Sequence, residues 1–398
     1  MRVVLLALAA LALASGVDAA TPTPTPRARS SSSPTPVVLW HGMGDNCCMG
    51  IRGIGELIAR EIPGTHVHSV MLGSNPAEDA YRGFVGDVNA QVESQCETLA
   101  LDARLAGGFH AIGFSQGGQF LRALAQRCGD RLNVRSLITL GGQHQGVAAP
   151  PRCGGDATAA AAAAEEEEEE DDGEEEEDDG ASSASVGALC RAMTDAIARG
   201  AYARFTRDRI VQAQYFKDAN DLASYRKHNP FLPDVNNELV DDGGEETRNE
   251  TYRRNLLRLE KLVLFKWTDD TVVVPRESSW FGTYAENDRG GAIVPLREQR
   301  MYAEDWLGLR ALDEAGRLKL LEIPGDHMTF TREWFVTNVI DAHLREGGGF
   351  KGAAGRWWLG GGPWRGGVRA FARWLRGATT RRRDDDDDDD DDDAYGIE

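Results

Sequence analysis

After its first twenty residues the sequence has no run of eighteen uncharged apolar residues, so it offers no later candidate for a transmembrane helix. It also lacks an excess of basic residues. Of its 64 acidic residues, 24 lie in two runs, at 165–179 and 384–393, and the other 40 nearly balance the 44 basic residues. This balance excludes a protein that binds nucleic acid through a strongly positive face. A hydrophobic content of 41% allows a substantial core and excludes a wholly disordered chain.

Residues 1–20 have the features of a secretory signal peptide. Arg2 provides a positive charge, Val3 to Ala14 forms an apolar segment, and small residues at 17–20 provide a cleavage site. The apolar segment is short for a bilayer span, and the Thr-Pro repeats after it are unlike a stop-transfer flank. A membrane anchor is the alternative. We expect a mature chain without an integral membrane span that enters the secretory pathway.

The cysteines have no C-x-x-C spacing and few histidines near them, which argues against a zinc site, and we expect neither a metal nor a cofactor. The six are Cys47, Cys48, Cys96, Cys128, Cys153 and Cys190. An even number suits disulfides in an oxidising compartment, and fifteen sets of pairs are open. One sequon, Asn249-Glu250-Thr251, is a candidate for glycosylation on a surface loop, with an unmodified asparagine as the alternative.

Short apolar runs alternate with helical patterns through much of the chain. We predict strands at residues 37–40, 67–72, 109–114, 134–140, 262–267 and 318–323, and helices at 51–62, 89–105, 116–127 and 331–344. This alternation indicates an α/β fold with a doubly wound, mostly parallel sheet.

Changes of composition divide the chain into segments. The expected segments are a Thr/Pro/Ser linker at 21–36, a core made of 37–153 and 260–346, a low-complexity acidic insertion at 154–185, a helical subdomain at 186–259 and a Gly/Trp/Arg and poly-Asp tail at 347–398. We expect the acidic insertion and the tail to be disordered, because their charges repel one another and they bury little. Weak contact between the tail and a membrane surface, through its tryptophans and arginines, is the alternative for that segment.

The stretch Gly113-Phe114-Ser115-Gln116-Gly117 fits the G-x-S-x-G pattern of a nucleophile elbow. A serine on a tight strand-to-helix turn has a strained backbone, which is tolerated when its neighbours are small. The pattern alone is weak evidence, but here it follows an apolar strand and precedes a helical pattern. We predict that Ser115 is a catalytic nucleophile, with a plain turn serine as the alternative.

A serine nucleophile needs a base, and the base needs an orienting carboxylate. In this kind of sheet the expected order along the chain is Ser, Asp, His. His327 follows the last predicted strand and is the predicted base. Asp269 and Asp270 both follow the strand that ends at Trp267, and Asp270 is the predicted carboxylate, with a solvated loop residue as the alternative. Asp326 is a rival, but it lies too close to His327 in sequence to reach the far ring nitrogen easily.

The oxyanion formed on attack needs two donors that are already in place. The geometry of an elbow makes the backbone amide of Gln116 one of them. The loop His41-Gly42-Met43-Gly44 follows the first predicted strand, and we expect the amide of Met43 to be the second. The glycines also suit a plain turn, and both interpretations can hold together.

The sequence resembles the palmitoyl-protein thioesterase family. The similar blocks are Trp40 to Asp45 with Cys47-Cys48, Gly113 to Ala123, Gly141 to Val147, Trp280-Phe281-Gly282 and Gly325-Asp326-His327, within a resemblance that spans roughly Pro36 to Leu344. The resemblance implies an α/β-hydrolase fold and a triad of Ser115, Asp270 and His327. It also implies disulfides Cys47–Cys48, Cys96–Cys128 and Cys153–Cys190, the last pair enclosing the acidic insertion.

The activity that the resemblance implies is hydrolysis of S-linked long-chain fatty acyl groups, such as palmitoyl. The substrates would be S-acylated proteins or peptides and long-chain acyl thioesters, in a lysosome or vacuole, with secretion as the alternative. A lipase or carboxylesterase with the same triad, and a hydrolase-fold binding protein without catalysis, are the alternative functions. A long acyl chain needs an apolar groove. Apolar residues of the segment 186–259 are candidates for its wall, or for that segment's own core: Phe205, Ile210, Tyr215, Phe216, Phe231 and Leu232.

Overall fold

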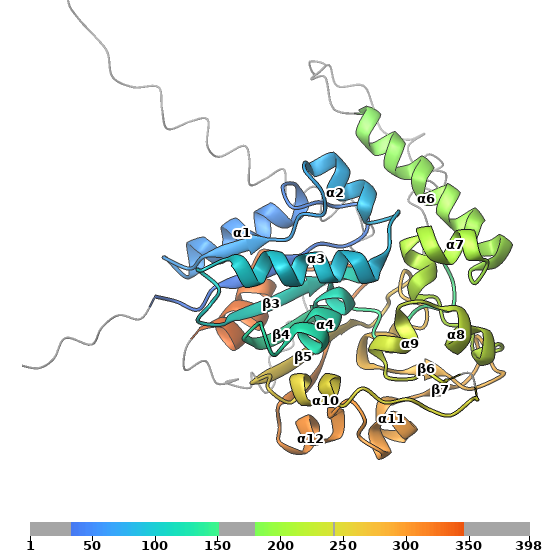
Figure 1. Cartoon of the computed structure of the whole chain (residues 1–398). Helices are drawn as coiled ribbons and strands as arrows, with labels where there is room; N and C mark the ends of the chain where they lie inside the picture. The colour runs from blue at the N-terminus through green and yellow to red at the C-terminus, as the bar shows by residue number, and fades with distance from the viewer. Residues whose placement is uncertain (1–32, 151–179, 242, 346–398) are drawn as a thin grey trace, which may run out of the picture. The chain divides into compact units, whose positions relative to one another are not determined.

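A six-stranded parallel sheet lies at the centre of the protein (Figure 1). The computed structural model describes residues 33–150, 180–241 and 243–345. In their order across the sheet the strands are β2 (Val67–Ser69), β1 (Val37–Trp40), β3 (Phe109–Phe114), β4 (Val134–Leu140), β5 (Lys261–Trp267) and β8 (Leu318–Ile323). Every neighbouring pair is parallel. The predicted α/β-hydrolase fold, with its doubly wound parallel sheet, is confirmed.

The inner strands β1, β3, β4 and β5 are largely buried on both faces because helices cover both faces of the sheet. Along β1, Val38 and Trp40 belong to one buried cluster, while Val37 and Leu39 belong to a second cluster on the opposite face. Helices α3 (Val88–Leu101), α4 (Gln116–Cys128) and α10 (Glu250–Leu256) contribute to the first cluster. Helix α1 (Gly50–Glu61), the short α13 (Arg332–Phe335) and the π-helix η4 (Val336–Leu344) contribute to the second. The predicted last helix is thus present as two consecutive helices of different type.

Strand β2 is shorter than its predicted range, and a side chain explains the difference. Val70 still donates its amide to the carbonyl of Leu39, at 2.8 Å. The amide of Leu72 instead donates to the carboxylate of Asp79, at 2.6 Å. Asp79 lies on α2 (Pro76–Arg82), the helix that follows this turn. The carboxylate therefore draws the chain out of the strand.

A helical lobe lies between β4 and β5. It consists of α6 (Gly180–Gly200), α7 (Arg204–Arg209), the 3₁₀ helix η1 (Val211–Tyr215), α8 (Leu222–His228), α9 (Leu232–Val235) and α10. The first of these helices begins inside the segment expected to be a low-complexity insertion. The lobe shares the core of the sheet, since the ring of Phe231 packs edge-on against Phe120 of α4, with 5.9 Å between ring centroids.

A run of very short elements connects β5 to β8 and was not predicted. It comprises η2 (Arg276–Trp280), β6 (Thr283–Tyr284), β7 (Ile293–Val294), η3 (Leu296–Glu298), α11 (Arg300–Ala303) and α12 (Leu309–Glu314). Strands of two residues and helices of a single turn are too short to produce a periodic pattern of apolar residues.

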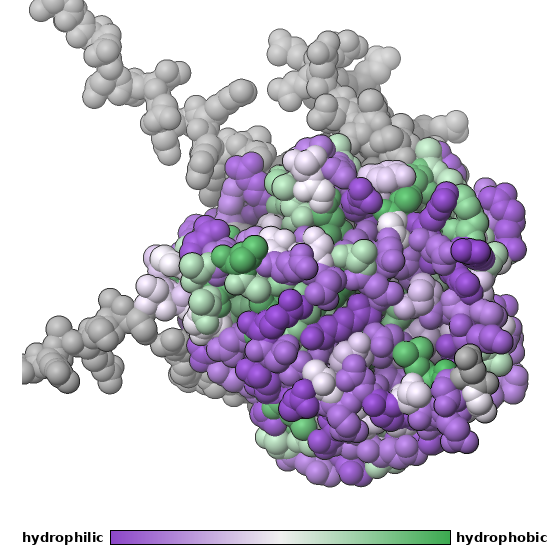
Figure 2. Space-filling model, in the orientation of Figure 1, coloured by the Kyte–Doolittle hydropathy of each residue, from purple (hydrophilic) through white to green (hydrophobic). Residues whose placement is uncertain are grey.

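The visible face of the protein is mostly hydrophilic, with apolar side chains in small scattered groups (Figure 2). None of the helices in the described ranges is both long and apolar enough to cross a bilayer. The predicted signal peptide, nearly all of the linker, the acidic insertion up to residue 179 and the whole of the tail at 347–398 lie outside the described residues.

Candidate active site

The predicted nucleophile, base and carboxylate all follow the carboxyl ends of strands. Ser115 follows β3, Asp270 comes after β5 and His327 comes after β8. These strands lie on the same half of the sheet, in the order β3-β4-β5-β8. Because parallel strands end at one edge, loops that are far apart in sequence meet there.

The backbone at Ser115 is strained, with a φ of 51°. A Cβ on Gly117 would lie 2.3 Å from the carbonyl oxygen of Trp40, and a Cβ on Gly113 would lie 2.4 Å from the Cα of Gly118. Only glycine fits at either position, because real Cβ atoms do not come so close to backbone atoms. The two glycines let the strand, the serine and helix α4 pack tightly enough to present the serine side chain at the sheet edge.

Ser115, His327 and Asp270 form a continuous chain of hydrogen bonds. The distance from Ser115 Oγ to His327 Nε2 is 3.0 Å, and the distance from His327 Nδ1 to Asp270 Oδ2 is 2.7 Å. The other carboxylate oxygen of Asp270 accepts the amides of Val272 and Val273, at 2.9 and 2.8 Å. The carboxylate is buried and fixed by its own loop, so it can orient the imidazole.

The rival aspartates have other partners. Asp326 accepts the amide of Thr271 and the amide of His327 itself, at 2.9 and 2.7 Å. It therefore joins the Asp270 loop to the His327 loop without contacting the imidazole. Asp269 is exposed and its carboxylate accepts a bond from the hydroxyl of Thr268.

The two amides predicted as oxyanion donors lie on the elements that flank Ser115. Gln116 is the first residue of α4, where backbone amides have no partner within the helix. The loop that contains Met43 lies against the nucleophile, since a Cβ on Gly42 would be 3.2 Å from the Cβ and 3.9 Å from the Oγ of Ser115. The role of the Met43 and Gln116 amides as oxyanion donors stays a prediction.

Gln143 also contacts the predicted nucleophile, although it was not predicted from the sequence. It lies after β4 and is buried, and its Nε2 donates a hydrogen bond to Ser115 Oγ at 3.0 Å. Its Oε1 is buried without a hydrogen-bond partner among the described residues. Its position after Gly141-Gly142, at the end of a predicted strand, is the signal that could have identified it.

His41 directly follows β1 and His144 lies four residues after the end of β4, and among the described residues neither ring forms a hydrogen bond with Ser115. The Nε2 of His144 lies 3.0 Å from the hydroxyl of Thr139, and its ring stacks on Phe281. Burial, and then the charge of Arg122, lowers the pKa of His144 well below its ordinary value. His144 is therefore a neutral core residue.

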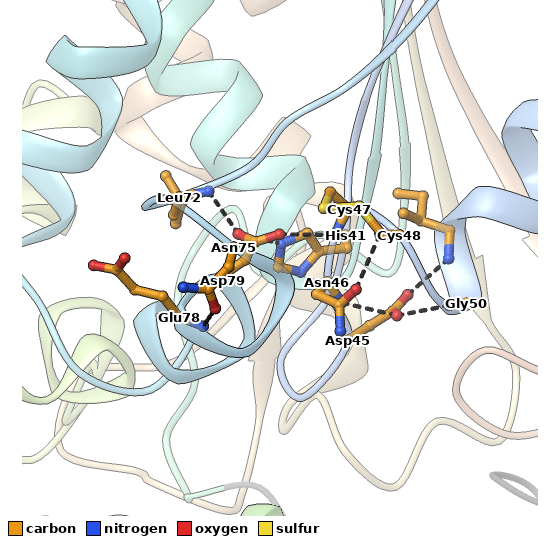
Figure 3. Close-up of a disulfide and its surroundings, with 11 residues drawn as sticks. His41, Asp45, Asn46, Cys47, Cys48, Gly50, Leu72, Asn75, Glu78 and Asp79 are labelled. Carbon is orange, nitrogen blue, oxygen red and sulfur yellow. Dashed lines mark hydrogen bonds and ion pairs between the residues drawn. A yellow bond between two sulfur atoms is a disulfide. The ribbon is translucent and has the colours of Figure 1, made fainter. Parts of the chain in front are cut away.

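A buried carboxylate organises the loop that carries Met43 (Figure 3). Asp79 accepts Nε2 of His41 at 3.1 Å, the amide of Cys47 at 2.7 Å and the amide of Leu72 at 2.6 Å. The side chain is fully buried, and so is that of His41. A single residue of α2 thus holds both sides of the turn that follows β1.

The ring of His41 has an acceptor at each nitrogen, since Nδ1 lies 2.8 Å from the carbonyl oxygen of Gly42. Burial alone lowers the pKa of His41, but the hydrogen bond and charge of Asp79 outweigh burial, and the net pKa is raised above its ordinary value. An imidazolium ring that donates to both acceptors fits this environment.

Comparison with known proteins agrees with this geometry. The family described as "Palmitoyl protein thioesterase" matches residues 36–327. Palmitoyl-protein thioesterase 1 of Caenorhabditis elegans is 39% identical over 310 residues, which cover 77% of this chain and 91% of the relative. The chain belongs to the palmitoyl protein thioesterase family. Palmitoyl-protein thioesterase 3 of Dictyostelium discoideum is 29% identical over 71% of this chain and 81% of its own length. Lysosomal thioesterase PPT2 of Homo sapiens is 25% identical over 71% of this chain and 78% of its own length.

The part of the chain that matches the palmitoyl protein thioesterase family begins just before β1 and ends at His327. It therefore contains the three residues of the hydrogen-bonded chain, both predicted oxyanion donors and Gln143.

Two of the three disulfides that the family resemblance implied are present, Cys47–Cys48 and Cys96–Cys128. Cys153 lies outside the described residues, so its pairing with Cys190 stays a prediction. Asn249 is exposed at the start of α10, where its side chain caps the helix by accepting the amide of Thr251 at 3.0 Å. Its glycosylation also stays a prediction.

Most of the residues suggested for an acyl-binding wall are buried in the core. Tyr215, Phe216, Phe231 and Leu232 all belong to the cluster beneath the lobe, which is the alternative that the sequence left open. Phe205 is 66% exposed, with the guanidinium of Arg209 over its ring.

Proposed function

We propose that this protein is a serine thioesterase that removes long-chain acyl groups, such as palmitoyl, from cysteines of lipid-modified proteins or peptides. The single observation that carries the proposal is the chain of two hydrogen bonds from Ser115 through His327 to Asp270, at 3.0 and 2.7 Å. Membership of the palmitoyl protein thioesterase family supports the substrate class.

In the first half of the reaction, Ser115 Oγ attacks the thioester carbonyl carbon while His327 Nε2 takes the hydroxyl proton. The carbonyl oxygen becomes an oxyanion and accepts hydrogen bonds from the amides of Gln116 and Met43. When the intermediate collapses, the carbon–sulfur bond breaks and the cysteine leaves as a thiolate, which takes the proton from His327. The acyl group remains on Ser115 as an ester.

In the second half of the reaction, His327 removes a proton from water, and the hydroxide attacks the ester carbonyl. The same two amides stabilise the second oxyanion. Ser115 Oγ leaves with the proton from His327, and a free fatty acid is released. Asp270 holds the imidazole in one tautomer throughout and stabilises its charged form.

Gln143 has a positioning role in this proposal. Its amide donates to Ser115 Oγ, while the hydroxyl of Ser115 donates to His327. The oxygen is thereby held at two points, with one lone pair left to attack. Preorganisation of this kind lowers the entropic cost of reaching the transition state.

The helical lobe contributes to the site through η1. Tyr215 donates its hydroxyl to Oε1 of Gln116 at 3.1 Å, and Gln212 donates Nε2 to the same atom at 3.3 Å. We infer that these bonds hold the residue whose backbone amide faces the oxyanion, and that the lobe contributes to the binding of the acyl chain.

The place of action follows from the relatives and the sequence together. Several related proteins are named lysosomal thioesterases. The predicted signal peptide and the two disulfides suit an oxidising secretory compartment. We infer that this protein acts on S-acylated proteins or peptides in the lysosome or an equivalent vacuole.

Two experiments separate the alternatives. A fluorophosphonate probe should label the wild-type protein and fail to label Ser115→Ala, whereas a binding protein without a working triad would not be labelled in either form. Rates on matched palmitoyl thioester and oxyester substrates then distinguish a thioesterase from a lipase or carboxylesterase. Faster hydrolysis of the oxyester would overturn the proposed substrate class.

A further inference from the structure

Two histidines and an aspartate meet on the edge of the sheet that is remote from Ser115. His66 directly precedes β2 and His68 lies within it, so the alternation of an extended chain points both rings to one side. Asp102 follows the last residue of α3 and caps that helix. We propose that His66, His68 and Asp102 form a binding site for a divalent transition-metal ion, with Zn²⁺ as the best fit.

The distances between the ligand atoms suit a single ion. The Nε2 of His66 is 3.6 Å from Oδ2 of Asp102, and the Nδ1 of His68 is 3.8 Å from the same oxygen. All three ligand atoms lie within 4.8 Å of one another. Neighbouring ligand atoms around a tetrahedral zinc ion are about 3.4 Å apart, given metal–ligand bonds of about 2.0–2.2 Å. The two measured separations therefore exceed the required spacing by less than about half an ångström.

His66 has a ring nitrogen available for coordination. Its Nε2 is buried and makes no hydrogen bond among the described residues, although the atom faces Asp102. A buried polar atom without a partner has a free-energy cost that a bound ion would remove. The side chains of His66 and His68 are about a quarter and a fifth exposed, at 25% and 21%, so an ion has a route to them from solvent.

Arg104 is the competitor for this ligand set. Its guanidinium donates to both oxygens of Asp102, at 2.8 Å each. The Arg104 side chain is 64% exposed and the Asp102 side chain is 11% exposed, so the arginine can move into solvent while the carboxylate stays in place. Only the arginine end of this bidentate pair is exposed, so a metal ion must displace the guanidinium to bind Asp102, and the pair lowers the affinity of the site for the ion.

The ligand types and their number select the metal. Imidazole nitrogen and carboxylate oxygen are ligands that zinc accepts, whereas Ca²⁺ and Mg²⁺ prefer oxygen alone.

The site joins the start of β2 to the end of α3. Val67 pairs with Val37 at the start of β1, while Ser115 lies at the opposite ends of the strands. The role assigned to the ion is therefore structural, and the ion takes no part in hydrolysis.

The test uses the full chain, freed of metal with a chelator and then titrated with Zn²⁺ by calorimetry and by thermal unfolding. We expect one ion to bind each chain and the midpoint of unfolding to rise, because a ligand that binds the folded state stabilises it. Co²⁺ in place of Zn²⁺ should give the visible absorption of a four- or five-coordinate ion, a direct report on coordination.

Four variants make the assignment specific. His66→Ala and His68→Ala should each weaken Zn²⁺ binding at least about tenfold, since even residues behind the ligands change metal affinity by about that factor. Arg104→Ala should tighten binding about threefold to fivefold, because it removes the competing ion pair. His228→Ala is the matched control for loss of a histidine elsewhere and should bind as the wild type does.

Each variant should hydrolyse a thioester at the wild-type rate in the presence of chelator, which shows that it is folded. No uptake of Zn²⁺ by the wild type would overturn the proposal. Uptake that persists in His66→Ala and His68→Ala would also overturn it, since the acidic runs at 165–179 and 384–393 would then be the binding sites.

Discussion

The hydroxyl of Ser115 is held by a base on one side and by an amide donor on the other. The donor, Gln143, reaches it at 3.0 Å. We predict that Gln143→Ala lowers kcat about tenfold to hundredfold with little change in KM, because the serine loses its fixed position before attack. Steady-state kinetics on a palmitoyl thioester give both constants.

Gln95→Ala is the control for that experiment. Gln95 is also buried and donates to a backbone carbonyl, that of Met71 at 3.3 Å, but it lies on α3. Its loss should affect stability and leave kcat unchanged. A wild-type kcat for Gln143→Ala would contradict the positioning role.

We predict that His343 makes the protein less stable in acid. Burial, followed by the charges of Lys261 and Lys319, lowers the pKa of His343 to about 4. Between about pH 6.5 and pH 4 the unfolded chain binds a proton at this residue that the folded chain does not bind. The unfolding free energy should therefore fall as the pH drops through this window, by about 2 kcal/mol at about pH 5, at 1.36 kcal/mol per pKa unit.

The variant His343→Leu tests whether this residue causes the fall in unfolding free energy at low pH. Both ring nitrogens of His343 are buried without hydrogen-bond partners among the described residues, so an apolar side chain should be tolerated. Denaturant unfolding at about pH 7 and about pH 5 should show a smaller loss of stability in the variant than in the wild type. His110→Leu should act in the same direction, since burial also lowers the pKa of His110 to about 4. If the wild type and the variants lose the same unfolding free energy between these two pH values, the buried histidines are not the cause of the acid sensitivity.

Ser115, His327 and Asp270 could be predicted from the sequence because each is a residue type with its own chemistry at the end of a predicted strand. For Gln143 the sequence shows only its position after Gly141-Gly142 at the end of a predicted strand, because nothing in the sequence shows which hydroxyl a buried glutamine faces. Asp79 is a similar case. Its three hydrogen bonds depend on a turn whose shape it helps to determine.

The strand, elbow and helix α4 pack closely enough to require glycine at two positions. We predict that Gly117→Ala is destabilised by more than about 4 kcal/mol or fails to fold, since its Cβ would overlap the backbone of β1. Gly107→Ala is the control, because nothing lies within 4 Å of the Cβ that it adds. Expression yield and the denaturation midpoint compare the two. Equal stability of both variants would contradict the close packing of this element.

The turn after β1 depends on α2 through the carboxylate of Asp79. We predict that Asp79→Asn costs at least about 3 kcal/mol and lowers kcat, because the buried His41 loses its charged partner and the Met43 loop loses its anchor. Its half-buried neighbour Glu78, whose carboxylate bonds to Ser74 and Arg82, provides the control variant Glu78→Gln, which should be much less destabilised than Asp79→Asn.

The stability that Asp79→Asn loses should depend on pH in a definite direction. The folded-state pKa of His41 is raised, so its contribution to stability is complete below its unfolded pKa and is lost as the pH rises through its folded pKa. The deficit of Asp79→Asn relative to the wild type should thus be larger at about pH 5 than at about pH 9. A deficit that grows with pH would contradict a charged His41.

The elements that could be predicted are those with a clear period. The ranges of β1, β3, β4 and β8 agree with their apolar runs, and β1, β3 and β4 are buried on both faces along nearly all of their length. The end of β2 could not be predicted, because a hydrogen bond to Asp79 determines it. The helices of three to six residues before β8 could not be predicted, because they are too short to show a period.

At the scale of the whole molecule, the two disulfides should contribute unequally to the free energy of unfolding. Cys96–Cys128 closes a loop with a sequence separation of 32, while Cys47–Cys48 joins adjacent residues. The chain-entropy relation gives about 4 kcal/mol for the first and about 1 kcal/mol for the second. Replacing each pair with alanine and measuring denaturant unfolding should reproduce this order. A larger loss from the Cys47–Cys48 pair would show that its local bonds, and not the entropy of the chain, dominate.

For the molecule as a whole, the parallel sheet could be predicted from the alternation of strands and helices, and the family could be predicted from its motifs. The contact between the lobe and the elbow could not be predicted, because the hydrogen bonds from Gln212 and Tyr215 to Gln116 join residues about a hundred positions apart. A serine protease-like triad alone also does not select thioesters over oxyesters.

The most direct test follows the release of free thiol from an S-palmitoyl peptide by wild type and Ser115→Ala at matched concentrations. We expect steady release by the wild type and a rate at the background level for Ser115→Ala, with both proteins showing the same denaturation midpoint. Thiol release by Ser115→Ala at a rate near that of the wild type would contradict it.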